Sequence, residues 1–224
     1  MLPFLRQRPF DARTLGVANA AAAGLMGAAS GGLIYEGLSY SPSRVGLGFV
    51  VGLAFIAVSQ AIVERRPAPT VGDLKGADAR RALLLLGVMT LHSAAEGIGL
   101  GVSFGGGQAL GLFITAAIAV HNIPEGLAIG LVLVPKGVSV SRAAGWSIFS
   151  SLPQPLLAVP AFLFVTAFAG LLPVGLGFAA GAMFWMVFAD LIPEALRTTS
   201  RSAVALTVIT SAAAMTALQL LIKP

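Results

Sequence analysis

The sequence predicts an all-α, polytopic membrane protein, a bundle of seven transmembrane helices. Only 10% of its 224 residues are charged, 57% are hydrophobic and the mean hydropathy is +0.91, whereas a soluble domain carries about 25% charged residues. Apolar stretches near the length of about 20 residues that spans a bilayer recur along the whole chain. The segments between them alternate between rich and poor in Lys and Arg, which is typical of membrane topology. We therefore expect a single transmembrane domain over residues 1–224.

Short breaks rich in Gly, Pro or Ser separate most of the apolar stretches, as at 41–43 and 105–107. The predicted spans are 14–39, 45–63, 82–104, 108–134, 142–168, 171–196 and 203–222. The longest polar segment is 64–81, ERRPAPTVGDLKGADARR, which contains Pro and Gly. We expect it to form a flexible loop.

The basic residues indicate how the chain is oriented. With seven spans, one side of the membrane receives all but Arg44 and Lys223 of the 14 Lys and Arg residues. The positive-inside rule places that side, with the N-terminus and the 64–81 loop, in the cytoplasm and the C-terminus outside. The net charge of +5 thus reflects topology, and we expect no nucleic-acid partner. The absence of cysteine excludes disulfides and thiolate metal sites.

Two similar motifs, HSAAEG and HNIPEG, place ionisable residues inside apolar spans. Each has a His, a Glu four residues later and a Gly directly after the Glu: His92 with Glu96, and His121 with Glu125. Residues i and i+4 of a helix share one face, and ionisable groups within a membrane span are functional by default. Two such pairs predict a four-ligand nitrogen and oxygen site for a divalent transition metal, and these ligands accept zinc, iron, manganese and other ions.

The predicted depth of both motifs favours a site near the middle of the membrane. His92 lies about 15 Å along its helix from Ala82, and His121 about 20 Å from Gln108, in a core about 30 Å thick. The two helices run in opposite directions, and an inverted repeat with a midplane site is typical of transporters. The alternative is a structural one, in which two buried His–Glu hydrogen bonds lock the helices together.

Several polar residues and prolines lie beside these motifs. Ser93 and Asn122 directly follow the two histidines, and either metal ligation or hydrogen bonding between helices explains them. Pro124 removes a backbone donor within its helix and frees the carbonyl of Val120. The segment SSLPQP, with Gln154 between two prolines, predicts a helix broken at a polar cavity.

Charged residues at the ends of other spans are less informative. Asp190 and Glu194, near the predicted cytoplasmic face, either help release cations or are ordinary interfacial charges. Glu36, near the predicted outer face, either belongs to an entry funnel for cations or is a residue whose side chain snorkels to the interface. The sequence contains no HExxH motif and no phosphate-binding loop, so we expect no enzymatic activity. An intramembrane hydrolase would need a water-activating metal with an open coordination position.

At these motifs the chain resembles the Zrt/Irt-like (ZIP) family of divalent-metal transporters, especially bacterial and plastid-type members with HNIPEG. SLPQPL, FADLIPEAL and AAAGLMGAASGGLIYEG are similar to further helices of that family. The resemblance implies a ZIP fold lacking its first helix, because the family typically has eight. It implies that the main metal site consists of His92, Glu96, His121 and Glu125. It implies that Ser93, Asn122 and Gln154 contribute to an adjacent second site.

The resemblance also implies what the protein does. We expect a carrier that moves Zn²⁺ or a similar divalent cation into the cytoplasm by an elevator-like motion, in a homodimer within a cell membrane, the bacterial inner membrane foremost. No cofactor other than the transported metal is implied. Many family members have Glu where this chain has Gln154, which predicts a weak second site. The alternative function is a non-transporting membrane metal-binding or sensor subunit.

Overall fold

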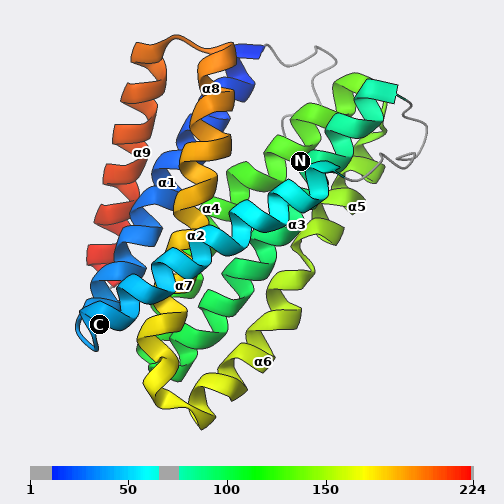
Figure 1. Ribbon diagram of the computed structural model, residues 1–224. Coiled ribbons are helices and arrows are strands. Elements are labelled where there is room, and N and C mark those ends of the chain that lie inside the picture. The colour runs from blue at the N-terminus through cyan, green and yellow to red at the C-terminus, as the bar shows by residue number, and fades with distance from the viewer. Residues whose placement is uncertain (1–11, 66–75, 223–224) are drawn as a thin grey trace.

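The computed structural model describes residues 12–65 and 76–222, and the regular elements in these two ranges are helices (Figure 1). In chain order they are α1 (Ala12–Leu38), α2 (Pro42–Arg65), α3 (Gly76–Gly105), α4 (Gln108–Leu133), η2 (Val134–Lys136), α5 (Val140–Ser151), α6 (Pro153–Ala167), η3 (Ala169–Leu171), α7 (Leu172–Met186), η4 (Val187–Leu191), α8 (Ile192–Thr198) and α9 (Arg201–Ile222). The η2 and η3 segments are short 3-10 helices, and η4 is a π-helix.

Seven helical spans in the described residues are long and apolar enough to cross a membrane, which confirms the predicted number. They are Arg13–Leu38, Pro42–Val63, Ala82–Gly105, Gln108–Lys136, Val140–Ala167, Ala169–Thr198 and Arg201–Ile222. One span combines α5 with α6, and another combines η3, α7, η4 and α8.

Helix extends into both ends of the predicted 64–81 loop. α2 continues to Arg65, and α3 begins at Gly76 rather than at residue 82. The first residues of α3, Gly-Ala-Asp-Ala-Arg-Arg, include the strong helix formers Ala and Arg, so helix formation there does not require apolar character. Residues 66–75, the centre of the predicted loop, lie outside the described residues.

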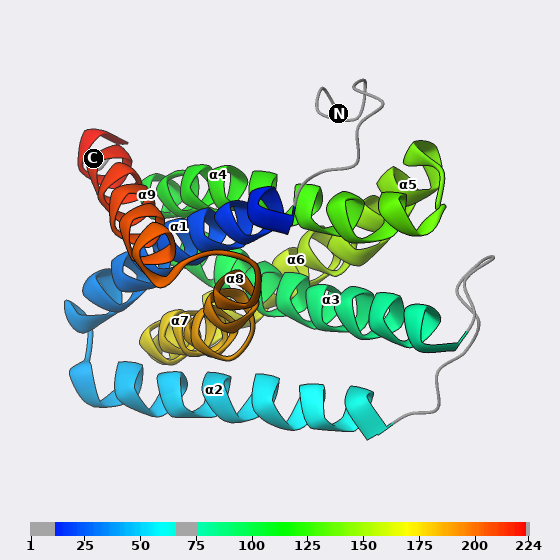
Figure 2. The same cartoon turned by 90° about the horizontal axis from the view of Figure 1, so that it is seen from above.

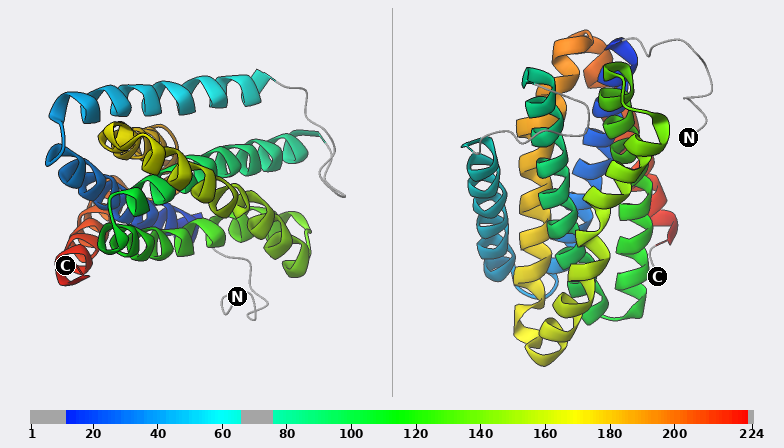
Figure 3. Two further views of the ribbon diagram at one scale, coloured as in Figure 1. Left: turned by 90° about the horizontal axis from the view of Figure 1, so that it is seen from below. Right: turned by 90° about the vertical axis from the view of Figure 1, so that its right-hand side faces the viewer.

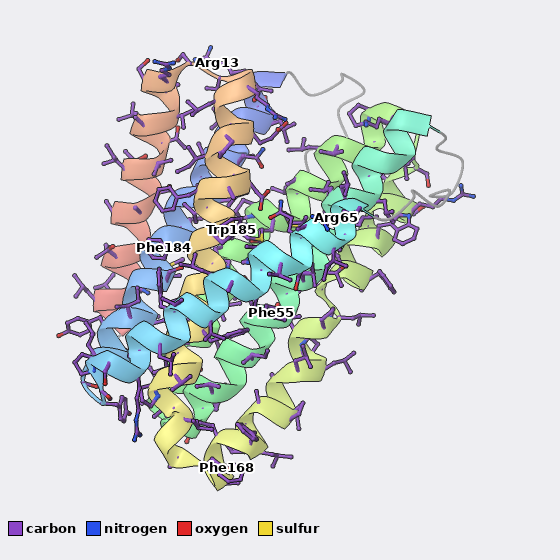
Figure 4. All side chains as sticks on the ribbon, viewed as in Figure 1. Arg13, Phe55, Arg65, Phe168, Phe184 and Trp185 are labelled. Carbon is purple, nitrogen blue, oxygen red and sulfur yellow. The ribbon has the colours of Figure 1, made fainter. Side chains whose placement is uncertain are left out.

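Successive spans alternate in direction, so the bundle has two ends that Arg13 and Phe168 mark in Figure 4. The start of α1, the end of α2, the start of α3, the end of α4 and the start of α5 lie at the Arg13 end. The turns between α1 and α2, α3 and α4, and α6 and α7 lie at the Phe168 end (Figure 1). The predicted cytoplasmic side corresponds to the Arg13 end. Residues 1–11 and 223–224, at the two termini, are not among those described.

The buried core lies where α1, α3, α4 and α7 meet. Met26, Ile114, Leu176 and Met183 are among its largest fully buried side chains. Seen along the bundle, α7 and α8 lie between α2 on one side and α1 on the other (Figure 2). Both views in Figure 3 place α2 at an edge of the bundle. The outward faces of α2, α6 and α9 expose large apolar side chains, as lipid contact requires.

The span formed by α5 and α6 is interrupted, as the prolines in SSLPQP predict. α5 ends at Ser151 and α6 begins at Pro153, and the chain changes direction there (Figure 1). Pro153 and Pro155 have no backbone N–H, so neither can donate the usual hydrogen bond to the preceding turn. By contrast, α4 continues through Pro124 without interruption. The break in α5–α6 lies beside α3, with which both helices pack.

Candidate metal centre

Four ionisable side chains meet between α3 and α4, which pack side by side in opposite directions. His92 and Glu96 come from α3, and His121 and Glu125 come from α4. Three of the four are almost completely enclosed, while Glu125 keeps 8% of its surface exposed. The small exposed part of Glu125 makes this carboxylate the member of the group closest to open space.

The contacts cross between the two motifs. His121 Nε2 lies 2.5 Å from Glu96 Oε1, and His92 Nε2 lies 3.0 Å from Glu125 Oε1. The contact within the first motif, from His92 Nε2 to Glu96 Oε1, is 3.1 Å. One candidate donor atom from each of the four residues lies within 4.8 Å of all the others. Two antiparallel helices thus direct two imidazoles and two carboxylates at one point.

This donor set fits a divalent transition metal in chemistry and in size. Zinc accepts imidazole nitrogen and carboxylate oxygen at about 2.0–2.2 Å, which separates tetrahedral donors by about 3.4 Å. The three close contacts are 2.5–3.1 Å and all four donors lie within 4.8 Å of one another, so small side-chain shifts would fit an ion between them. With both imidazoles neutral, the two carboxylates carry two negative charges, which a divalent cation would balance. Uncompensated buried charges in a membrane are costly.

The outward-facing nitrogens of the two imidazoles have a different environment. Nδ1 of His92 and Nδ1 of His121 are buried, and neither has a hydrogen-bond partner among the described residues. Packing and the contacts of Nε2 therefore orient both rings. This arrangement leaves each Nε2, and not Nδ1, directed at the shared point.

The other three predicted site residues lie next to this group. Asn122 and Gln154 join their side-chain amides by a hydrogen bond of 2.9 Å between α4 and α6. With both amides turned over, Gln154 donates to Asn122, and Asn122 Nδ2 donates to Glu96 Oε1 at 3.3 Å. Ser93 is buried and faces the cavity that Asn122 and Glu125 also line. The structure thus brings all seven candidate residues into one region.

The glycine after each glutamate brings α5–α6 close to the site. A Cβ atom on Gly97 would lie 2.8 Å from the Cα of Gln154, so only glycine allows this approach of α6. A Cβ atom on Gly126 would lie 3.2 Å from the hydroxyl oxygen of Ser147 on α5. The repeated Glu-Gly pair therefore places one half of the broken helix against each motif.

A small cavity of about 20 Å³ adjoins Glu125, with room for about one water molecule. Its polar wall consists of Ser93, Asn122 and Glu125 with Ser147, Ser150 and Ser151 of α5, and Met89, Gly126 and Ile129 complete it. Ser150 and Ser151 were predicted from sequence only as part of the helix break, and Ser147 was not predicted. The spacing of the serines at 147, 150 and 151 could have indicated this wall, because residues three and four apart share one helix face.

Asp190 and Glu194, the acidic residues of FADLIPEAL, have other partners. Gln60 Nε2 of α2 donates to Asp190 Oδ1 at 2.9 Å, and Trp185 Nε1 donates to Gln60 Oε1 at 2.8 Å. Glu194 forms an exposed ion pair with Arg197 at 3.1 Å. The sequence did not predict the contact between α2 and the π-helix that contains Asp190. Neither acid joins the group of four donors.

Comparison with known proteins gives a consistent result. Residues 66–219 match the family described as ZIP zinc transporter. The chain is 49% identical over 216 residues to an Arabidopsis thaliana protein described as a candidate zinc transporter, covering 95% of this chain and 35% of that protein. It is 37% identical over 161 residues to the zinc transporter GufA of Myxococcus xanthus, covering 69% of this chain and 61% of GufA.

A third relative is the zinc transporter ZIPB of Bordetella bronchiseptica, which is 32% identical over 124 residues. That match covers 55% of this chain and 40% of ZIPB. The matches thus span between about a third and three fifths of the length of these relatives.

Proposed function

Because this chain belongs to the ZIP family of zinc transporters, we propose that it carries a divalent transition-metal ion, Zn²⁺ foremost, across a membrane. The main binding site consists of His92, Glu96, His121 and Glu125. The observation that carries the proposal is the convergence of these four buried donors at one point between two membrane spans. Fe²⁺, Mn²⁺ and Cd²⁺ are alternative substrates, because imidazole and carboxylate ligands also accept these ions.

We propose that Ser93, Asn122 and Gln154 form a weaker, neutral extension of this site. Their position beside Glu96 and Glu125 supports this role. Hydroxyl and amide oxygens carry no net charge. These oxygens therefore bind a divalent cation more weakly than the carboxylates do, which suits an ion in transit.

The proposed direction of transport is into the cytoplasm, with the Arg13 end on the cytoplasmic side. The positive-inside distribution of Lys and Arg supports this orientation. The chain has no cysteine, so single cysteines can report on it directly. Cysteines replacing Ser41 and Arg65, at opposite ends of α2, should react with impermeant thiol reagents from opposite sides of the membrane. Reaction of both from the same side would contradict the seven-span topology.

We further propose that α3, α4, α5 and α6 move together as the metal-carrying unit against a scaffold containing α1, α2 and α7. The boundary between the two units supports sliding, because small residues meet across it. Gly99 of α3 faces Ala179 of α7, and Gly175 of α7 faces Val102 of α3. A homodimer that holds the scaffold in place, in a bacterial inner membrane, completes the proposal.

The decisive experiment is zinc uptake into proteoliposomes that contain the purified chain. Uptake that saturates with zinc and is absent from protein-free vesicles supports a carrier. Tight zinc binding without uptake would favour the alternative, a metal-binding or sensor subunit. Repeating the assay with Fe²⁺, Mn²⁺ and Cd²⁺ ranks the substrates. The family is one of transporters, and we propose that the chain catalyses no reaction.

A further inference from the structure

The lining of the cavity beside Glu125 shows on which side of the metal centre it lies. α3 runs away from the Arg13 end, so Met89 lies one turn nearer that end than His92 and Ser93. α4 runs toward the Arg13 end, so Ile129 lies one turn nearer that end than Glu125. Both residues line the cavity. On the opposite side of the four donors, Val102, Ile114 and Ala117 are buried and apolar. The polar cavity beside Glu125 therefore lies on the Arg13 side of the four donors.

The third wall of this cavity is a row of hydroxyl groups on α5. Ser147, Ser150 and Ser151 all line it, and Ser150 is 1% exposed. The hydroxyls of Ser150 and Ser151 each donate to the carbonyl of Ser147 at 3.0 Å, and their oxygens remain available as acceptors. The Ser147 hydroxyl packs against Gly126, the neighbour of Glu125.

The break after α5 adds a backbone oxygen to this wall. Pro155 has no N–H and cannot donate to the carbonyl of Ser151, four residues earlier. A backbone carbonyl without its helical donor is tolerated within a membrane only where it is buried in protein or lines a water-filled cavity. Ser151 lines the cavity. The helix break therefore leaves a carbonyl without its helical donor at Ser151, a residue of the cavity wall.

We infer that this cavity is the passage by which the metal exchanges between Glu125 and the Arg13 end, and that Ser147 and Ser150 control access along it. This inference rests on the proposed function. Hydroxyl and carbonyl oxygens replace water molecules around a divalent cation one at a time as the ion leaves the carboxylate. Because they are neutral, they do not hold the ion as strongly as the four donors do. Glu125, which has an exposed edge in this cavity, is the donor that the ion leaves last.

The first test measures access to the passage with single cysteines. Ser147→Cys and Ser150→Cys are expected to react with a small charged thiol reagent added on the side where a cysteine replacing Arg65 reacts. Saturating Zn²⁺ is expected to slow both reactions. Ser30→Cys is the matched control, because Ser30 is fully buried on α1 and bonds only the carbonyl of Met26. It is expected to be unreactive.

The second test fills the passage. Ser147→Leu is expected to keep equilibrium Zn²⁺ binding within about twofold, because Ser147 is not one of the four donors. Release of bound zinc, and uptake, should slow by about tenfold, equivalent to about 1.4 kcal/mol on the barrier. Gly145→Leu is the control, since a side chain at Gly145 points into open space on the same helix. It is expected to bind and release zinc as the wild type does.

Two results would overturn the inference. One is lack of reaction of Ser147→Cys and Ser150→Cys from the Arg65 side, and the other is zinc release from Ser147→Leu as fast as from Gly145→Leu. Failure of the proposed function would look different. A wild-type chain that binds zinc but moves none into vesicles removes the transport proposal, while cysteine reactivity and zinc release still decide whether this cavity is the route to the site.

Discussion

His121 Nε2 lies closer to Glu96 Oε1, at 2.5 Å, than does His92 Nε2, at 3.1 Å, although His92 shares a helix with Glu96. Each histidine therefore makes its shortest contact with the glutamate of the other motif, since His92 lies 3.0 Å from Glu125. The metal centre depends on the register between α3 and α4 and cannot form on either helix alone.

Replacing one donor should weaken zinc binding strongly and abolish transport. His121→Ala or Glu125→Ala leaves three donors in a buried site, and zinc affinity is expected to fall by at least about 100-fold, more than changes outside the ligand shell cause. Both variants should still insert and fold. The measurements are equilibrium zinc binding and vesicle uptake, with Glu194→Gln as a control because Glu194 pairs only with Arg197 among the contacts described. Near-normal uptake by both variants would refute the assigned site.

Zinc affinity should fall as the pH is lowered. A metal binds neutral imidazole and ionised carboxylate, so protons compete with it. Both histidines of the chain belong to the candidate site, so protonation of either imidazole should weaken zinc binding. The check is zinc titration of the purified chain at a series of pH values. His121→Ala should show a shallower dependence, and a wild-type affinity that stays constant through this range would argue against histidine ligands.

Gln154→Glu should strengthen a second metal site. Gln154 bonds Asn122, which adjoins Glu96, and a carboxylate there would offset the repulsion between two neighbouring dications. We expect one tight zinc per wild-type chain and two for the variant. Elemental analysis after dialysis gives the stoichiometry, with Gln108→Glu at the exposed start of α4 as the control. Two equally tight zinc ions in the wild type would contradict the role assigned to Gln154.

Gly97→Ala should destabilise the protein near the metal centre. The added Cβ would lie 2.3 Å from the carbonyl oxygen of Gln154 and 2.8 Å from its Cα, and overpacking of this kind costs about 1–3 kcal/mol. We expect a lower thermal unfolding temperature in detergent and weaker zinc binding. Gly31→Ala is the matched control, because nothing lies within 4 Å of its Cβ position. Equal stability of the two variants would show that α6 does not need this close approach.

The spans and the central site could be predicted from sequence because both depend on strong, local signals. Apolar length identifies a membrane helix, and four ionisable residues within apolar spans are conspicuous. The break at Pro153 followed from the missing N–H of proline. These properties belong to residues themselves and do not depend on their neighbours in space.

The remaining features depend on packing between helices. Nothing in the motifs shows that His92 contacts Glu125 or that Gln60 bonds Asp190. Ser147 lines the cavity because Gly126, distant in sequence, leaves room for it. Likewise, α3 begins at Gly76, six residues before its apolar stretch, because charged residues can form helix outside a membrane as readily as apolar residues do inside it.

The broken helix touches both motifs at once, and this has a consequence for the timing of transport. Ser147, before the break, packs against Gly126, and Gln154, after it, packs against Gly97. Only Leu152 separates α5 from α6. In the proposed movement of α3 to α6 as one unit, this helix pair keeps its contacts with both motifs. We therefore expect all four donors to cross in one step and to stay assembled around the ion.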